Sequence, residues 1–312
     1  MAILSLPRPR LGGAASSEWA GPLLALVAFL LFSLMDAVVK TLAVRYPAPE
    51  IVLGNGLVML MVVAAMTLRR GGLAHLRTRR PGLQLLRGLA STLAATAAFF
   101  AFSRIPLADA YAIIFTTPLL VTLLSVPFLG EVVGWRRTAA VVVGFMGVMI
   151  MLQPGQGELG AGNLAALIAA FGAATGIIVM RKLATSESTV SIALYSNLTV
   201  VIALGLPLPA YGVMPTAADL GLFLLSGGLG SAALLLLISA YRLAPAALVA
   251  PLQYSQMIWG VLLGILIFGD LPGLHVLIGG AIVAASGLFT LYRQRVVRAE
   301  RAAVAVEDAA AS

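Results

Sequence analysis

Two ionisable residues of opposite charge, Asp36 and Lys40, stand four positions apart within a long apolar stretch of the sequence. Residues four apart lie on the same face of a helix. Charged side chains at membrane depth are costly, and they face a cavity or each other. The spacing therefore predicts a site for substrate binding or ion coupling, or else an internal ion pair whose Lys40 reaches toward the membrane surface.

A later apolar stretch carries two amides and two aromatic rings, in Gln253, Tyr254, Gln256 and Trp259. Gln253, Gln256 and Trp259 share one helix face at i, i+3 spacing. Polar groups at lipid depth need hydrogen-bond partners. Amide hydrogen bonds combined with aromatic stacking predict a site for a planar heterocycle, and hydrogen bonds between packed helices are the competing interpretation.

Five other polar residues lie in apolar stretches. Tyr111 and Thr117 are candidates for the opposite wall of the same substrate site. Asn55, Tyr195 and Asn197 are further polar groups at depth, and hydrogen bonds between helices explain them equally well. The phenylalanines at 99, 100 and 102 line an aromatic pocket or, as we favour, pack against other helices.

Membrane-spanning helices must position these residues, because 61% of the chain is hydrophobic and only 10% is charged. Soluble domains are about half apolar and about a quarter charged. A spanning helix needs about 20 apolar residues, and the charges here are separated by stretches of that length. The predicted spans are 21–44, 50–68, 82–103, 107–129, 135–152, 161–181, 189–209, 218–240, 245–268 and 272–292.

The predicted fold is an all-α integral membrane protein. Lipid offers no hydrogen-bond partner to bare backbone, so a chain spans it as helices or as a closed barrel. These stretches are too long and too uniformly apolar for barrel strands, which alternate. The sequence contains no cysteine, which excludes disulfides, cysteine zinc sites and thiol catalysis.

The distribution of positive charge predicts the orientation. With both termini in the cytoplasm, 17 Lys and Arg residues fall in cytoplasmic segments, whereas only Arg45 and Arg104 fall in outside segments. Cytoplasmic loops of membrane proteins collect these residues. The asymmetry also supports a count of ten, because a missed span would invert every later loop.

The two halves of the sequence match at an offset of 139 positions. The matched pairs are Pro106 with Pro245, Gly130 with Gly269, Glu131 with Asp270, and Gly134 with Gly273. Five spans per copy is an odd number, so the second copy enters the membrane from the opposite side. Inverted repeats of this kind place the substrate site at the repeat interface. The predicted organisation is a cytoplasmic tail at 1–20, repeats at 21–152 and 161–292, and a disordered cytoplasmic tail at 293–312.

The chain resembles the drug/metabolite transporter superfamily, EamA type, over about residues 20–292. The first half carries Phe102-Ser103-Arg104-Ile105-Pro106-Leu107-Ala108-Asp109-Ala110, Pro118-Leu119, Leu129-Gly130-Glu131 and Gln153-Pro154-Gly155, and the second half carries Leu243-Ala244-Pro245, Phe268-Gly269-Asp270 and Ala285-Ser286-Gly287. The resemblance implies ten helices, an inverted repeat and cytoplasmic termini. Met35 to Lys40 and Tyr254 to Trp259 look most like the branch that takes up riboflavin and S-adenosylmethionine.

These features predict a secondary transporter of a small organic metabolite, with riboflavin or a similar planar molecule as the first candidate. The alternatives are S-adenosylmethionine uptake, export of amino acids or other small metabolites and, remotely, a membrane-embedded enzyme. The sequence holds no HExxH, GxSxG or GxxxxGK motif. The GxGxxG at 155–160 lies in a loop between spans, without the strand that a dinucleotide site needs.

We expect no cofactor, no metal and no nucleic-acid partner, because cytoplasmic loops account for the net charge of +8. The expected partners are a small-molecule substrate and the lipid bilayer, and the expected location is the cell inner membrane. The pairs Gly172–Gly176 and Gly260–Gly264 indicate close helix approach, either within one chain or in a homodimer. Glu131 and Asp270 are predicted to sit at helix ends, where gating is one role for them.

Overall fold

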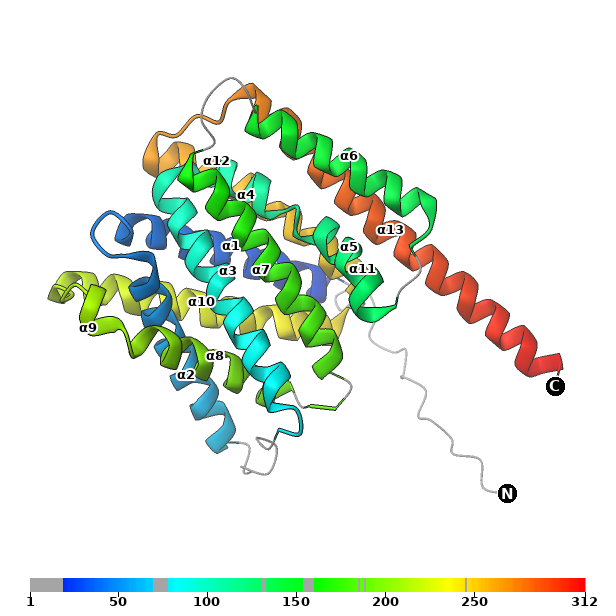
Figure 1. Cartoon of the computed structure of the whole chain (residues 1–312), viewed down its shortest axis with the longest axis horizontal. Coiled ribbons are helices and arrows are strands. Elements are labelled where there is room, and N and C mark those ends of the chain that lie inside the picture. The colour runs from blue at the N-terminus through cyan, green and yellow to red at the C-terminus, as the bar shows by residue number, and fades with distance from the viewer. Residues whose placement is uncertain are drawn as a thin grey trace.

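The computed structural model of the protein describes residues 19–69, 78–130, 133–153, 160–184, 186–187, 189–244 and 246–311. Within these ranges the chain forms helices and no strand, so the all-α prediction is confirmed there (Figure 1). The long helices are α1 (Ala20–Leu42), α2 (Ala48–Arg69), α3 (Pro81–Arg104), α6 (Trp135–Leu152), α7 (Ala161–Leu183), α8 (Thr189–Gly205), α10 (Ala217–Leu243) and α13 (Leu274–Ala311). The short ones are α4 (Leu107–Ile114), α5 (Thr117–Leu129), α9 (Leu208–Tyr211), α11 (Ala246–Val249), the 3-10 helix η2 (Ala250–Tyr254), α12 (Ser255–Leu263) and the π-helical η3 (Gly264–Phe268).

Nine helical segments of the described chain are long and apolar enough to cross a membrane. They correspond to every predicted span except the seventh. The stretch predicted at 189–209 forms α8 and the short α9, and its apolar helix, Ser191–Gly205, is shorter than the other nine. The count of ten spans therefore stays a prediction.

The predicted span at 107–129 is broken in its middle, between α4 and α5. Pro118 has no backbone N–H, so it cannot continue the helix by donating to the carbonyl of Ile114. The hydroxyl of Thr117 donates to that carbonyl instead, at 2.6 Å. A hydroxyl that replaces a missing backbone donor is a usual way of tolerating a break at membrane depth.

The predicted span at 245–268 is also irregular, passing through α11, η2, α12 and η3. Pro251 stands in the first turn of η2, where its missing donor interrupts the α-helical hydrogen bonds. The segment ends at Gly269, whose φ is +69°, and the α4–α5 span ends at Gly130, whose φ is +66°. Glycine is the residue that reaches this left-handed conformation at little cost. Glu131 and Pro245 lie outside the described residues.

Helices of the two predicted repeats pack against each other in pairs. α1 lies along α10, α3 along α7, and α6 along α13. Figure 1 shows the α6–α13 pair side by side at one edge of the molecule. By their order in the two halves, α1 corresponds to α7 and α3 to α10. Under the predicted repeat, the α1–α10 and α3–α7 contacts would be equivalent.

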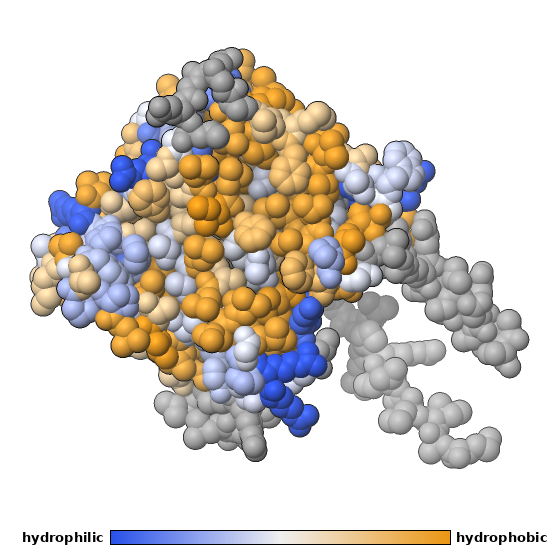
Figure 2. All heavy atoms as spheres, in the orientation of Figure 1, coloured by the Kyte–Doolittle hydropathy of each residue, from blue (hydrophilic) through white to orange (hydrophobic). Residues whose placement is uncertain are grey.

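Large apolar side chains cover the outer surface of the bundle. α3 exposes Leu85, Leu89 and Leu93, and α6 exposes Val142 and Met146. The face seen in Figure 2 is mostly hydrophobic, with hydrophilic residues gathered toward its periphery. Soluble monomers rarely expose large contiguous apolar patches. Lipid is the solvent that this surface fits.

Hydrogen bonds join distant segments at the end of the bundle where α1 ends and α2 begins, here called the α1–α2 end. Arg45 Nη1 lies 3.2 Å from Asp219 Oδ2, and the Tyr46 hydroxyl donates to the same oxygen at 2.8 Å. The backbone N–H of Val213 donates to Glu50 at 2.9 Å. These contacts hold the α1–α2 connection against the start of α10.

The last helix, α13, continues past the predicted span to Ala311. The prediction of a disordered tail is therefore wrong for residues 293–311, which are helical. Alanine, glutamate and arginine are among the strongest helix formers. Extending an existing helix is also easier than nucleating a new one.

Candidate functional site

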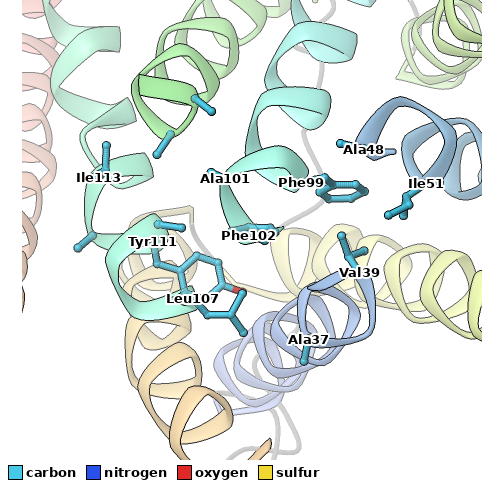
Figure 3. Close-up of a cluster of buried hydrophobic side chains, with 14 of the residues drawn as sticks. Ala37, Val39, Ala48, Ile51, Phe99, Ala101, Phe102, Leu107, Tyr111 and Ile113 are labelled. Carbon is cyan, nitrogen blue, oxygen red and sulfur yellow. The ribbon is translucent and has the colours of Figure 1, made fainter. Parts of the chain in front are cut away.

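Asp36 is buried in α1 and accepts a hydrogen bond from the phenol of Tyr111 in α4. The hydroxyl of Tyr111 lies 2.5 Å from Asp36 Oδ2, and the two side chains are 3% and 6% exposed, respectively. Figure 3 shows the Tyr111 ring reaching from α4 toward α1, with Phe102 and Leu107 beside it. Two predicted site residues that are 75 positions apart therefore meet in the interior.

Lys40 does not pair with Asp36, although the two share a face of α1. Its Nζ lies 2.6 Å from Asp270 Oδ2 and 3.3 Å from the carbonyl oxygen of Ile105, and it stands 4.8 Å from the ring centroid of Phe268. The interpretation of Asp36 and Lys40 as an internal ion pair is therefore wrong for this structure. Packing brings Asp270 to Lys40 from 230 positions away.

Asp36 has no cationic partner within the described ranges of the chain. A carboxylate removed from water needs a positive charge, several hydrogen-bond donors or a proton. The Tyr111 phenol supplies one donor. The arrangement therefore leaves Asp36 available to a proton or to the cationic group of a ligand.

A run of aromatic rings leads away from Asp36. Ring centroids are 5.7 Å apart for Phe102 and Tyr111, 5.9 Å for Tyr111 and Phe115, and 5.4 Å for Phe115 and Tyr254. Such separations are typical of favourable aromatic pairs. The run joins α3, α4 and the end of η2, so it connects the carboxylate to the irregular second-half span.

Phe115 and Tyr254 occupy equivalent positions at the offset of 139 that relates the two halves. Phe115 ends α4 at the break in the first-half span. Tyr254 ends η2, directly before α12. The two breaks therefore face each other, and their equivalent side chains touch.

Two glycines permit these aromatic positions. A Cβ atom at Gly260 in α12 would collide with the ring of Tyr111, and one at Gly287 in α13 would collide with the hydroxyl of Tyr254. Both rings thus lie directly against a neighbouring helix. Glycine is needed where another group approaches the backbone this closely.

Several buried polar atoms near the second-half break have no hydrogen-bond partner among the described residues. They are the hydroxyls of Tyr254 and Ser255 and the indole nitrogen of Trp259. A buried polar group without a partner costs about 1–3 kcal/mol. Native proteins keep such groups where water, an ion or a ligand satisfies them. All three belong to one short segment, which makes that segment a candidate for ligand contact.

The two glutamines of this segment lie away from its exposed apolar residues. Gln253 is exposed and Gln256 is half-buried. Ile258 and Leu262, which are also exposed, mark the apolar side of the same segment. Five residues turn a helix by about 1.4 turns, so Gln253 and Ile258 lie on nearly opposite sides.

Three of the four other predicted site residues make structural hydrogen bonds instead. Asn55 accepts from Ser226 at 2.6 Å across the α2–α10 contact. Asn197 donates to Ala193 within its own helix at 2.9 Å. Thr117 serves the α4–α5 break, and Tyr195 is half-buried in α8. The structure thus places Asn55, Tyr195 and Asn197 in helices outside the cluster around Asp36.

Three residues that lie near Asp36 or Lys40 were not among the predicted site residues. Phe115 was visible as the counterpart of Tyr254 at the internal offset. Phe102 was assigned to packing, and its contact with Tyr111 depends on how α3 meets α4. Asp109 lies close enough to His275, Asp270 and Lys40 to interact electrostatically with each, and no local pattern would reveal that grouping.

A sequence model of the EamA-like transporter family matches this chain twice, over residues 19–153 and again over residues 160–292. Together the two matches cover most of the chain.

Two relatives are transporters. The chain is 31% identical over 221 residues to the S-adenosylmethionine uptake transporter of Rickettsia bellii, which covers 70% of this chain and 76% of that protein. It is 32% identical over 286 residues to the riboflavin transporter of Rhizobium johnstonii, which covers 90% of this chain and 93% of that protein.

A protein of known crystal structure has the same fold, with a TM-score of 0.61. The two chains are 21% identical, and the match covers 88% of this chain and 98% of the other.

Proposed function

The chain belongs to the EamA-like transporter family, and from this we propose that it is a secondary transporter that carries a small organic metabolite across the cell inner membrane. Ten spans, cytoplasmic termini and an inverted repeat at 21–152 and 161–292 are part of the proposal. The two family matches and the paired helix contacts support it. So does the contact between the equivalent residues Phe115 and Tyr254, because residues related by a two-fold axis touch only beside that axis.

The proposed substrate site lies where the two broken spans meet. Broken helices at a repeat interface are the usual setting of substrate sites in secondary transporters. Here Asp36 and Tyr111 supply a carboxyl and a phenol, while Tyr254 and Trp259 supply donors that have no partner of their own. Gln253 and Gln256 add amide groups on the side away from lipid, and Lys40 stands one turn from Asp36 at the α1–α2 end.

The single observation that carries the substrate class is the run of rings next to unpartnered donors. Aromatic side chains stack on planar rings, and donors such as phenol and indole bind ring nitrogens and carbonyls. We therefore propose a fused nitrogen heterocycle as the part of the substrate that this site binds. Riboflavin is the first candidate, since a relative that matches over 90% of this chain is a riboflavin transporter.

S-adenosylmethionine is the second candidate, and the unpaired Asp36 favours it. Its adenine is a fused heterocycle, and its sulfonium and ammonium groups are cations that a buried carboxylate would attract. Riboflavin carries no positive charge and would leave Asp36 to a proton. The two candidates therefore differ in their need for Asp36.

Transport by purified protein in lipid vesicles tests the proposal. Labelled riboflavin and labelled S-adenosylmethionine are offered separately, and protein-free vesicles serve as the control. Saturable uptake of one of them, blocked by excess unlabelled compound, identifies the substrate. Preloading the vesicles and following release tests export in the same preparation. If neither compound nor any of the amino acids moves faster than in the control, the metabolite-transporter proposal fails.

A further inference from the structure

One lysine at the α1–α2 end stands within reach of more than one carboxylate. Lys40 pairs with Asp270 at 2.6 Å. Asp36 lies four residues earlier on the same face of α1, which is the spacing at which an acidic and a basic side chain pair along a helix. Asp270 therefore holds a cation that Asp36 would otherwise attract.

We propose that Lys40 pairs alternately with Asp270 and with Asp36, and that its pairing with Asp36 displaces the substrate from the site. It rests on the proposed function for the existence of a second state, in which the α1–α2 end is open. In the state seen here, Lys40 is held by Asp270 and Asp36 is free for a ligand cation or a proton. When this end opens, Lys40 separates from Asp270. Its ammonium then moves by one helical turn along α1 and forms an ion pair with Asp36.

The contacts of Lys40 explain why opening would release it. Its ammonium binds the η3–α13 turn through Asp270, the α3–α4 turn through the Ile105 carbonyl, and the ring of Phe268 at the end of η3. These three partners come from elements other than α1. Their separation from α1 removes every one of those contacts at once, whereas Asp36 moves with Lys40 because both belong to α1.

The register of α1 against α4 places the two ends of the exchange one turn apart. Lys40 contacts Ile105 just before α4, and Asp36 contacts Tyr111 one turn into α4. Four residues of helix rise about 6 Å, a distance that a lysine side chain spans by changing rotamers. The ammonium is paired at both ends of the move, which avoids leaving an unpaired charge in a region of low dielectric.

Two other charged groups, Asp109 and Arg45, must be considered as alternative partners in this exchange. Asp109 lies close enough to Lys40, Asp270 and His275 to interact with each, and one of its oxygens is buried without a partner. Asp109 is therefore the competing destination for Lys40. Arg45 is paired with Asp219 and stands nine positions from Asp36, so it cannot replace Lys40.

The test uses dicyclohexylcarbodiimide, a lipid-soluble reagent that labels protonated carboxyls and spares carboxylates paired with a cation. Peptide mass spectrometry measures labelling of Asp36 in purified full-length protein. In Asp270→Asn, Lys40 loses its partner and takes Asp36, so labelling of Asp36 is expected to fall about fivefold. Adding Lys40→Gln to that variant removes the competing cation, so labelling should return to the wild-type level.

Asp219→Asn is the matched control, because it breaks the other ion pair at the same end without freeing a cation that can reach Asp36. Labelling of Asp36 should not change in it. The proposal is overturned if Asp270→Asn labels like wild type, or if Lys40→Gln fails to restore labelling. If labelling falls at Asp109 and not at Asp36, Lys40 has paired with Asp109. That result also overturns the proposal.

Thermal unfolding decides the matter if the reagent does not reach Asp36 in any variant. A double-mutant cycle between Asp36→Asn and Lys40→Gln measures whether the two residues interact. The interaction should be absent with Asp270 present and should appear in Asp270→Asn. Its presence in the wild-type background, or its absence in both, contradicts the proposal. Neither measurement needs a substrate, so both remain decisive if riboflavin and S-adenosylmethionine are not transported.

Discussion

The rings of Phe115 and Tyr254 lie 5.4 Å apart, although 139 positions separate them and each stands at a break in its own span. The contact joins the two halves at the point where neither has a regular helix. Groups that bind ligands in transporters are concentrated at such points. At a helix break, some backbone and side-chain groups do not interact within the helix and can contact a ligand.

Replacing Asp36 by Asn should reduce uptake of a cationic substrate by at least about tenfold, because an amide cannot balance a positive charge at membrane depth. Uptake of S-adenosylmethionine into vesicles measures the effect. Asn197→Ala is the control, since that amide bonds within its own helix. Wild-type uptake by the Asp36 variant would remove this residue from the site and from coupling.

Gly260→Ala should impair transport, while Gly264→Ala on the same segment should not. The added methyl at Gly260 strikes the Tyr111 ring and displaces the phenol from Asp36, whereas the methyl at Gly264 meets its nearest atom, the Asp270 carbonyl oxygen, at 3.7 Å. Overpacking of this kind costs about 1–3 kcal/mol. Initial uptake rates and melting temperatures of both variants check the prediction. Equal behaviour of the two variants would contradict it.

Tyr254→Phe should leave the protein as stable as wild type or more stable by about 1 kcal/mol, because the hydroxyl that it removes is buried without a partner. The same change should weaken substrate binding by about tenfold, since the hydroxyl is proposed to bind the ligand. Melting temperature and the concentration for half-maximal uptake report the two effects separately. A less stable protein with unchanged uptake would make the hydroxyl structural.

Asn55→Ala should lower stability by about 1–2 kcal/mol and leave the half-saturating substrate concentration unchanged. It removes the acceptor of the Ser226 hydroxyl between α2 and α10. Asn197→Ala should cost less than about 0.5 kcal/mol, because only a bond within its own helix is lost. Thermal unfolding of the two variants in detergent gives the comparison. A changed half-saturating concentration in the Asn55 variant would show that this residue takes part in substrate binding.

Local properties of the sequence were sufficient for most of the fold. Hydropathy marks the helices because an apolar run of sufficient length can be solvated only by lipid, and nine such segments lie where they were predicted. The matched glycines Gly130 and Gly269 both adopt φ near +70° at a helix end, as the predicted repeat would require. The break beside Pro118 was missed because proline is compatible with a continuous span when neighbouring groups compensate.

The partners of the charged residues were decided by tertiary structure alone. The spacing of Asp36 and Lys40 predicts that they share a helix face, and they do, but each is held by a residue from elsewhere in the chain. Tyr111 reaches Asp36 from 75 positions away, and Asp270 reaches Lys40 from 230. Periodicity describes one helix at a time, whereas the free energy of an ion pair depends on which helices meet and in what register. For that reason the sequence identifies the ionisable groups, and only the packing of α1 against α4, α12 and the η3–α13 turn determines their partners.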